Sequence, residues 1–410
     1  MVQWLDENMI SHDVYILSCD EYTRKYDITK SKVAVFAHLY YEELISFCLT
    51  YLQNVPEEID IYITVISDKM KKLIEDQMSL RSAKKYNIII KENRGRDISS
   101  LLVACCEIIR NYDYICFIHD KGVSGYNTQE DINIWLNLMW DNLLRSQSFI
   151  YNIINKFDDD DKIGFFMPPH PYGKVINYAF TDGWGSNYEN VVELSNKLNL
   201  TIDIRKDLHS YSLSTAFWCK TESLNKLFMK EWRYDDFPKE PLPLDGSINH
   251  AIERILSYVV MDAGFKVAVL MNDNYAAAQY LTMHNLLCMS FNIFKYFSIT
   301  NINQLVDSHA KICKLISYTK NWSSIHIYGA GEIGLECSVL LRHLKICIQG
   351  FVVSDGHKKT NICVNHPIYE LSEIKENLKN GGLILALNDK NMEEVLKILV
   401  IEGINDYYIY

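Results

Sequence analysis

Short apolar runs alternate with helical patterns through the first part of the chain. Residues 32–38, 59–66, 87–90 and 114–118 are rich in β-branched and other apolar side chains, which is typical of buried strands. Between these runs, apolar residues recur at helical spacing. The order of strand, helix, strand and helix predicts an α/β fold whose parallel sheet carries helices on both faces.

A longer amphipathic helix is predicted at residues 248–261. Ile248, Ile252, Ile255 and Val259 recur at helical spacing and form one narrow apolar stripe. The polar residues of this segment fall on the opposite side of the helix. That side is expected either to face solvent or to contribute to a site.

The chain is expected to contain two domains, because 410 residues exceed what a single hydrophobic core usually serves. The patterns predict a lead-in at 1–30, an α/β domain at 31–275, a helical connection at 276–320 and a small Rossmann-like domain at 321–410. Residues 283–297 within the connection are apolar enough to pack between the domains or to contact a membrane surface.

Composition excludes some classes of function. The formal net charge of −11 argues against nucleic-acid binding, which needs a basic face. The eleven cysteines form no CxxC pair, which favours reduced thiols in a cytoplasmic protein. The first residues do not resemble a signal peptide, and no apolar run reaches the roughly 18 residues of a membrane span.

A charged turn, Asn93–Asp97 (NRGRD), follows the strand predicted at 87–90. Arg94 and Arg96 carry planar guanidinium groups that suit phosphate oxygens, and Asp97 can accept hydrogen bonds from a ribose or a base. Ligands of open α/β sheets bind outside the carboxyl ends of the strands, so this turn is expected to face a binding crevice. A solvated loop is the alternative.

Three polar residues, His119, Asp120 and Lys121, end the strand predicted at 114–118. His119 and Lys121 can neutralise a diphosphate, and Asp120 is a candidate ligand for Mg²⁺ or Mn²⁺. The alternative is an ordinary exit from a strand. In a parallel sheet, this group and the NRGRD turn should face the same crevice.

Asp245 stands just before the helix at 248–261 and after a proline-rich stretch. It can act as a general base or simply cap the helix, which stabilises by about 1 kcal/mol. His250 and Glu253 lie one turn apart on the polar side of the same helix, where they join the catalytic candidates. A solvated helix face is the alternative for both.

A second candidate site lies in the small domain predicted at 321–410. The stretch GAGEIG follows an apolar run and precedes a helical pattern, and it places Gly329, Gly331 and Gly334 at the spacing of a dinucleotide fingerprint. Asp355, about 20 residues further on, matches the acidic residue that contacts the ribose in such sites. The domain is about half the size of a full dinucleotide domain, which makes NAD(P) binding there less favoured.

The chain resembles the rhamnan synthesis protein F family over residues 31–275. The members of this family are glycosyltransferases of bacterial cell-surface polysaccharide assembly. The resemblance implies a GT-A-like fold, in which a nucleotide-sugar lies on a half-Rossmann sheet. It rests on five stretches in the family's order: VAVFAHLYYEELISFCLTYL, NRGRD, YDYICFIHDKG, STAFWCKTESLNKLF and LDGSINHAIERIL.

The resemblance also implies roles for individual residues. Asp97 would lie near the nucleotide, His119–Lys121 near the diphosphate, and Asp245 at the position of the inverting base. The family's strand usually ends in His-Thr-Lys, whereas this chain has Asp120 in place of the threonine and lacks an Asp-x-Asp motif. Little or no dependence on divalent cations is therefore expected.

The resulting expectation is an inverting glycosyltransferase at the inner face of the membrane. It would move a sugar, L-rhamnose from dTDP-L-rhamnose by family likeness or else a UDP-linked sugar, onto a lipid-linked glycan. Trp184 or Trp218 would stack against a sugar face. Two alternatives remain: an NAD(P)-dependent oxidoreductase acting on a nucleotide-sugar, and a non-catalytic glycan-assembly protein. The lack of a Tyr-x-x-x-Lys pattern beside GAGEIG speaks against the oxidoreductase.

Overall fold

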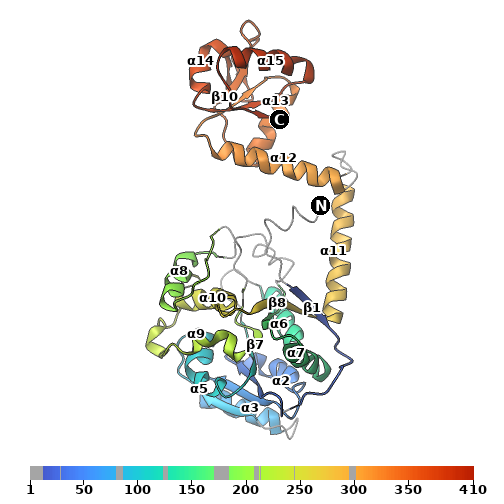
Figure 1. The fold of residues 1–410 in the computed structure, drawn as a ribbon, viewed down its shortest axis with the longest axis vertical. Coiled ribbons are helices and arrows are strands. Elements are labelled where there is room, and N and C mark those ends of the chain that lie inside the picture. Colours follow the sequence, from blue (N-terminus) through green and yellow to red (C-terminus); the bar gives the residue numbers. More distant parts are fainter. Residues whose placement is uncertain are drawn as a thin grey trace. The chain divides into compact units, whose positions relative to one another are not determined.

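The chain folds into two compact units, Met1–Met283 and His284–Tyr410, and helix α11 (Asp273–Phe294) runs across the boundary between them (Figure 1). Both units are α/β. The computed structural model describes residues 13–27, 29–79, 86–122, 128–169, 184–206, 212, 214–243, 245–294 and 302–410.

The first unit contains an eight-stranded sheet and its covering helices. The strands are β1 (Asp13–Leu17), β2 (Val33–His38), β3 (Asp60–Val65), β4 (Asn87–Ile90), β5 (Tyr114–His119), β6 (Ile163–Met167), β7 (Phe217–Lys220) and β8 (Lys266–Asn272). The helices are α2 (Ile45–Leu52), α3 (Asp68–Ser79), α4 (Arg96–Ser99), α5 (Cys106–Ile109), α6 (Gln129–Leu144), α7 (Gln147–Asp159), α8 (Tyr188–Lys197), α9 (Asn225–Phe228) and α10 (Ile248–Asp262). Short 3₁₀ or π turns lie at Glu42–Leu44, Ser100–Ala104, Thr221–Leu224 and Tyr234–Asp236.

The sheet order is β1-β8-β6-β7-β5-β2-β3-β4. All neighbours pair in parallel except β7, which is antiparallel to β5 and β6. The predicted α/β class is therefore confirmed, with one reversed strand. Two features of this sheet were not predicted. One is strand β8, and the other is the edge strand β1, which pairs with β8 and comes from the segment expected to precede the fold.

Helices cover both faces of this sheet (Figure 1). One buried apolar core lies beneath α2, α3, α6 and α7, and a second lies beneath α4, α5, α8 and α10. Alternate residues of a strand point to opposite faces, so Val35 and Ala37 of β2 join the first core and Ala34 and Phe36 join the second.

Helix α10 is buried on almost every side. Ile252, Ile255 and Val259 are fully buried, as the predicted stripe requires, but Arg254 and Ser257 on other faces are also only 7% and 0% exposed. The polar side of this helix therefore does not face bulk solvent. Its half-buried His250 and Glu253 are available to a site.

The second unit carries a six-stranded sheet in the order β11-β12-β10-β9-β13-β14. All of its strands are parallel to their neighbours except β11, so the parallel strands follow the Rossmann order 3-2-1-4-5. The strands are β9 (Ile325–Tyr328), β10 (Gly350–Val353), β11 (Ile362–Cys363), β12 (His366–Glu370), β13 (Gly382–Leu385) and β14 (Tyr408–Ile409).

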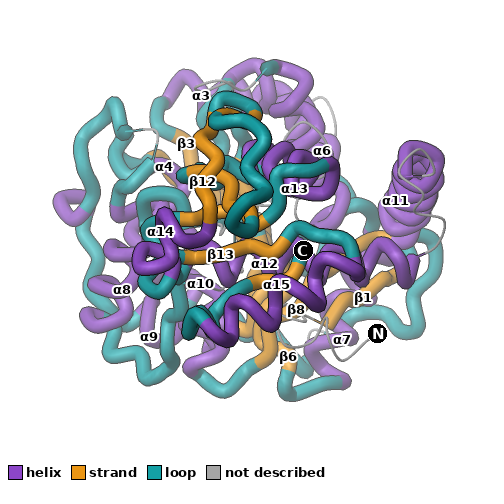
Figure 2. Tube along the Cα trace, turned by 90° about the horizontal axis from the view of Figure 1, so that it is seen from above, coloured by secondary structure: helices purple, strands orange, loops and turns teal. Residues whose placement is uncertain are grey.

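The helices of the second unit, purple in Figure 2, cover both faces of its sheet. They are α12 (Ile302–Lys320), α13 (Glu332–His343), α14 (Leu371–Leu378) and α15 (Asp389–Ile401). Residues of α12 and α13 pack in one apolar core, and residues of α14 and α15 pack in another. The predicted small Rossmann-like unit is confirmed.

Candidate active site

The carboxyl ends of four parallel strands meet at one edge of the first sheet. The last residue of β2, His38, is in register with Thr64 of β3 and with His119 of β5. His38 is buried, and its Nδ1 lies 2.9 Å from the Thr64 hydroxyl. Burial lowers the pKa of His38 to about 3, so the imidazole is neutral. A buried hydrogen bond between the His38 and Thr64 side chains therefore joins the carboxyl ends of β2 and β3.

The NRGRD turn follows β4 and has an unusual backbone. Gly95 and Arg96 both have positive φ angles, 75° and 48°. A Cβ on Gly95 would lie 2.7 Å from the Ser99 Cβ and 2.8 Å from the Phe237 ring, so only glycine fits this position. The turn leads directly into α4, which starts at Arg96.

The two arginines of this turn point in different directions. Arg94 donates from Nε to the Phe237 carbonyl at 2.7 Å and forms an ion pair with Asp235, and its side chain is 15% exposed. Three of its five N–H donors hold the 235–237 segment. Arg96 is 47% exposed, and its guanidinium contacts Glu240 at 3.2 Å. Of the two, only Arg96 faces accessible space.

Asp97, the last residue of the NRGRD turn, lies close enough to His119 and His38 for their charges to affect its pKa. Burial alone would raise its pKa, but the nearby His119 and a hydrogen bond from Thr215 outweigh burial and lower it. The carboxylate is therefore ionised at neutral pH. The effect of His119 on this pKa means that the NRGRD turn and the His119–Lys121 segment lie close together.

His119 and Asp120 take different orientations. The Nδ1 of His119 donates to the Asp120 carbonyl at 2.6 Å, which leaves Nε2 as the ring's other polar atom. The Asp120 carboxylate is buried and accepts hydrogen bonds from the backbone N–H groups of Tyr40 and Tyr41, both at 2.8 Å. Burial raises the pKa of Asp120 to about 7 despite these bonds.

This arrangement does not fit a metal centre. Among the residues that the structure describes, no three His, Cys, Asp or Glu side chains stand close enough together to hold a metal ion. Asp120, the predicted ligand, uses its Oδ2 to anchor the loop after β2. We therefore derive no step through a metal.

Lys121 carries its charge into the site. Its Nζ lies 4.0 Å from the centre of the Trp135 ring, a cation–π contact. Burial lowers the pKa of Lys121, while the charges of Glu253 and Asp97 act in the opposite direction. Glu253 belongs to α10 and Asp97 to the NRGRD turn. Lys121 therefore lies close enough to both elements for their charges to affect its pKa.

Helix α10 is fastened to the NRGRD turn by Asn249. Its side-chain amide donates to the Gly95 carbonyl at 2.8 Å, and only 5% of the residue is exposed. The N-terminal turn of α10, with the predicted Asp245, His250 and Glu253 around it, therefore lies next to the predicted donor-binding turn.

Asp245 is fixed by two residues that directly precede α8. Its Oδ2 accepts from the Ser186 N–H at 2.8 Å, and its Oδ1 accepts from the Asn187 side-chain amide at 2.5 Å. Burial raises the pKa of Asp245, but these two bonds and the charge of Arg254 outweigh it, so the pKa is lowered. The carboxylate is ionised and held in one orientation.

His250 is a neighbour of Asp245 rather than its hydrogen-bond partner. Its Nδ1 lies 2.8 Å from the Ser247 hydroxyl but 4.0 Å from the Asp245 Oδ1. Burial lowers the pKa of His250, so the ring is neutral at pH 7. Arg254, 3.8 Å from Asp245, supplies the positive charge in this group instead.

The two tryptophans expected to contact sugar are both core residues, so this prediction is wrong. Trp184 is 1% exposed and stacks on Tyr258, with 5.9 Å between ring centres. Trp218 is fully buried in β7, and its Nε1 donates to the Leu143 carbonyl at 3.0 Å. Each ring is enclosed by the protein and presents no face to a ligand.

A model of the family described as rhamnan synthesis protein F matches residues 2–265. The chain belongs to this family. The resemblance drawn from the five sequence stretches is thereby confirmed. The match covers nearly all of the first unit, including both strand-end groups and helix α10.

Individual relatives are more distant. Two uncharacterized proteins WxcX, from two strains of Xanthomonas campestris pv. campestris, are 23% identical over 245 residues, which cover 60% of this chain and 33% of theirs. The matched segment thus spans about a third of the length of these curated relatives. Mannosyltransferase PcManGT from Pyrobaculum calidifontis, solved in complex with GDP-Man and Mn²⁺, aligns with a TM-score of 0.34 and 12% identity, covering 66% of this chain and 61% of that one.

Four buried polar residues at the site of this family member were not predicted: His38, Lys91, Asn187 and Arg254. Lys91 follows β4 and donates to the Glu92 carbonyl at 2.8 Å, and burial lowers its pKa to about 8. A polar residue directly after an apolar strand was the signal used for His119, and it applies equally to Lys91. Asn187 and Arg254 gave no such signal, since their burial depends on contacts between segments that are far apart in the sequence.

The glycine-rich turn of the second unit has the geometry that its sequence predicts. Gly329 has a φ of 114°, and a Cβ on Gly334 would lie 1.9 Å from the Gly329 carbonyl oxygen. A Cβ on Gly331 would meet no atom within 4 Å. Asp355 accepts from the Ser372 N–H at 3.0 Å, at the start of α14, so its carboxylate already has a partner within the fold.

Within the described residues, no helix is long and apolar enough to cross a membrane. All eleven cysteines are free, and the six in the first unit are all buried. Cys347, which lies in an apolar run of the sequence, is exposed.

Proposed function

We propose that this chain is an inverting glycosyltransferase of polysaccharide synthesis that uses a nucleotide-sugar donor. Membership of the rhamnan synthesis protein F family supports a role in assembling a polysaccharide. The geometry supports transfer chemistry, because a fixed carboxylate and a group of cations lie at the same sheet edge.

The fixed orientation of Asp245 is the observation that carries this proposal. A carboxylate that accepts two hydrogen bonds, at 2.8 Å and 2.5 Å, stays ionised and cannot rotate freely. A general base needs its ionised form and a fixed direction toward the acceptor hydroxyl. A simple helix cap would place its oxygens on the N–H groups of α10, whereas these oxygens bind Ser186 and Asn187.

In the proposed step, the acceptor hydroxyl attacks the anomeric carbon of the donor sugar. A new C–O bond forms as the bond between that carbon and the diphosphate oxygen breaks. The hydroxyl proton moves to the Asp245 carboxylate, and the bonding electron pair leaves on the diphosphate. Attack from the face opposite the leaving group inverts the anomeric configuration.

The leaving diphosphate gains negative charge in this step. Lys121 and Arg96 supply fixed positive charge, and the Nε2 of His119 can bind a phosphate oxygen directly when it is protonated. Asp97, held ionised, would accept from the ribose or the base. Arg94 takes no part in this account, since its guanidinium already binds Asp235 and the Phe237 carbonyl.

The finer proposal is that the donor is dTDP-L-rhamnose and the acceptor a lipid-linked glycan, with the protein at the inner face of the membrane. The family description names a rhamnan, a polymer of rhamnose, and this supports rhamnose as the sugar. The formal net charge of −11 leaves nucleic acid out of the proposal, because binding it needs a basic face.

The test is release of nucleoside diphosphate from dTDP-L-rhamnose, UDP-glucose and GDP-mannose by the full chain, with and without a rhamnose-containing acceptor. We expect turnover with one donor and a product of inverted configuration by NMR. A folded protein that neither binds nor turns over any of the three would instead be a non-catalytic assembly protein. Turnover of UDP-glucose or GDP-mannose alone would retain the transferase and exclude rhamnose.

A further inference from the structure

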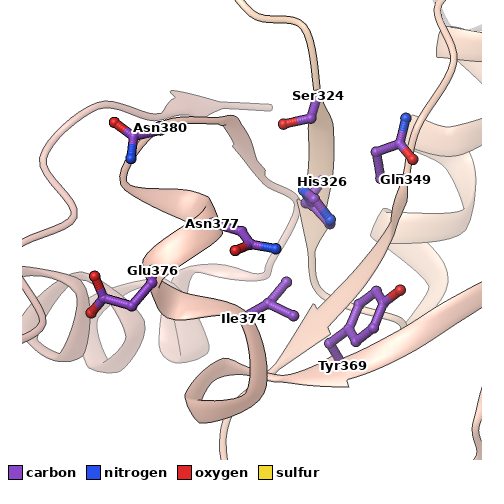
Figure 3. Close-up of a pocket in the computed structure, with 8 residues that line it drawn as sticks. All are labelled: Ser324, His326, Gln349, Tyr369, Ile374, Glu376, Asn377 and Asn380. Atoms are coloured by element: carbon purple, nitrogen blue, oxygen red, sulfur yellow. The ribbon is translucent and has the colours of Figure 1, made fainter.

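A hollow of about 530 Å³ lies in the second unit between α14 and strands β9, β10 and β12 (Figure 3). Ser324 and Gln349, which line it, directly precede β9 and β10. The hollow therefore lies at the amino ends of these strands. Nucleotides bind at the carboxyl ends in such folds, where the turn Gly329–Gly334 lies. The two features are separate.

The floor of the hollow contains an unpartnered imidazole. His326 is only 7% exposed, and its Nδ1 finds no hydrogen-bond partner among the described residues. Its neighbours Ile325 and Ile327 point into the core on the other face of the sheet, so the ring faces α14. Burial lowers its pKa, so the ring is neutral and keeps one donor and one acceptor nitrogen.

A glycine keeps the hollow open beside this ring. Gly350 is the register partner of His326 on β10. A Cβ at Gly350 would lie 2.8 Å from the Tyr369 ring and 2.7 Å from the Pro367 carbonyl oxygen. Any larger residue would displace Tyr369, whose ring centre lies 6.1 Å from that of His326.

The rim carries uncharged hydrogen-bonding groups and one carboxylate, that of Glu376. Figure 3 shows Asn377 pointing from α14 toward His326, with Glu376 pointing away from it. Within the described part of the chain, no hydrogen bond engages the side-chain amides of Gln349, Asn377 or Asn380. The carboxylate of Glu376 is paired with Lys379 at 2.8 Å. The residues that line the hollow include no lysine or arginine.

We propose that this hollow binds an uncharged saccharide of one or two residues. Sugar hydroxyls both donate and accept, and they match side-chain amides, the Ser324 hydroxyl and a neutral imidazole. The ring of Tyr369 and the side chain of Ile374 offer apolar surface for the C–H groups of a sugar. A phosphate or nucleotide would find no cation here, and burying its charge without one is unfavourable.

This proposal goes beyond transfer at Asp245. It gives the chain a second carbohydrate site, in a unit that the family match does not reach. Such a site would retain a glycan on the enzyme between successive encounters with donor, whichever sugar the first unit transfers.

The test is saturation-transfer NMR on the full chain with methyl α-L-rhamnoside, methyl α-D-mannoside and methyl β-D-glucoside, and with glucose 1-phosphate as an anionic probe. At least one neutral glycoside should bind. Gln349→Ala combined with Asn377→Ala, and separately His326→Phe, should each weaken that binding about tenfold or more, the worth of one or two hydrogen bonds. Asn391→Ala, which removes an exposed amide elsewhere in the unit, and Asp245→Asn should leave the affinity unchanged.

Three results would overturn the proposal. The first is that no glycoside of the panel binds. The second is binding that survives both sets of pocket substitutions, which would place it elsewhere on the chain. The third is stronger binding of glucose 1-phosphate than of every neutral glycoside. Should His326→Phe lower the melting temperature strongly, the Gln349 and Asn377 substitutions decide alone, because both side chains are exposed and removing them should not unfold the unit.

Discussion

The side-chain amide of Asn249 donates to the Gly95 carbonyl at 2.8 Å and joins residues 154 positions apart in sequence. This bond fixes the start of α10 against the turn that carries Arg96. Asp245 precedes α10 by three residues, and Arg96 follows Gly95 directly. The candidate base and one of the candidate diphosphate ligands are therefore held in one frame by a buried contact.

Asp245→Asn should lower turnover by a factor on the order of 10² to 10⁴, because the amide cannot take the acceptor's proton. Folding should change little. The Asn187 amide can rotate so that its Oδ1, which has no partner among the described residues, accepts from the new amide. Turnover and donor-nucleotide affinity are the two measurements, and the affinity should stay near that of the parent.

Asp262→Asn is the matched control at the other end of α10. Its carboxylate accepts from Thr201 and pairs with Lys226 at 2.6 Å, and these contacts lower its pKa to about 2 although burial opposes them. This substitution should reduce stability but leave turnover per folded molecule unchanged. Near-normal transfer by folded Asp245→Asn would eliminate the base assignment, and Glu253 would be tested next.

Lys121→Met should weaken binding of the donor's nucleoside diphosphate by about tenfold to a hundredfold, since one charge-assisted contact to phosphate is worth roughly 1.5–3 kcal/mol. Titration calorimetry measures the affinity. Lys156→Met provides the control, because the Lys156 Nζ also lies over an aromatic ring, that of Tyr15 at 5.3 Å. Equal losses in the two variants would mean that Lys121 acts only through packing.

Much of the site was readable from the sequence because its signals are local. Strands β2 to β5 were predicted from short apolar runs, and the polar residues that end them were found by position. The parallel pairing then placed these ends at one sheet edge. His119 and Lys121 became candidates in this way, and the same rule applied to His38 and Lys91 would have made them candidates too.

The remaining predictions failed where the orientation of a side chain or strand depends on residues far away in the sequence. Arg94 looks identical to Arg96 in the sequence, but Asp235 and the Phe237 carbonyl turn it away from the site. The local sequence does not distinguish a tryptophan of the core from one on a sugar-binding face. The burial of Trp184 and Trp218 could therefore not be predicted from it. Strand β7 runs antiparallel because of its connections, which periodicity does not encode.

Removal of divalent cations should leave most of the activity. The described carboxylates do not gather into a metal-binding group, and the proposed diphosphate ligands are the cations Arg96 and Lys121. Donor turnover is measured after exhaustive treatment with EDTA and again after adding Mg²⁺ or Mn²⁺. Loss of nearly all turnover in EDTA, restored by either ion, would contradict this expectation and return Asp120 to the role of a ligand.

The buried Asp120 should make the first unit less stable as pH rises. Its pKa is raised to about 7 in the folded state, above the unfolded value near 3.9, so the folded protein holds the proton more tightly. The resulting stabilisation is complete below pH 4 and is lost as pH increases to 7, by up to about 4 kcal/mol. Urea unfolding of the parent and of Asp120→Asn at pH 5 and pH 8 measures this loss. The difference in unfolding free energy between the two proteins should shift with pH in favour of the variant, and a constant difference would mean that Asp120 is ionised throughout.

The glycine-rich turn of the second unit allows packing to be separated from ligand binding. Gly334→Ala should destabilise this unit by about 1–3 kcal/mol, the usual cost of overpacking, because its Cβ would meet the Gly329 carbonyl oxygen at 1.9 Å. Gly331→Ala should be neutral for stability, since no atom lies within 4 Å of the new Cβ and its φ is not positive. Thermal unfolding of the two variants measures the contrast.

Titration with NADH then tests whether the open space at Gly331 binds a dinucleotide. If NADH binds the parent and Gly331→Ala abolishes that binding without a change in melting temperature, the turn holds a dinucleotide and the oxidoreductase alternative returns. If neither protein binds NADH and only Gly334→Ala loses stability, the three glycines serve the close approach of α13 to β9.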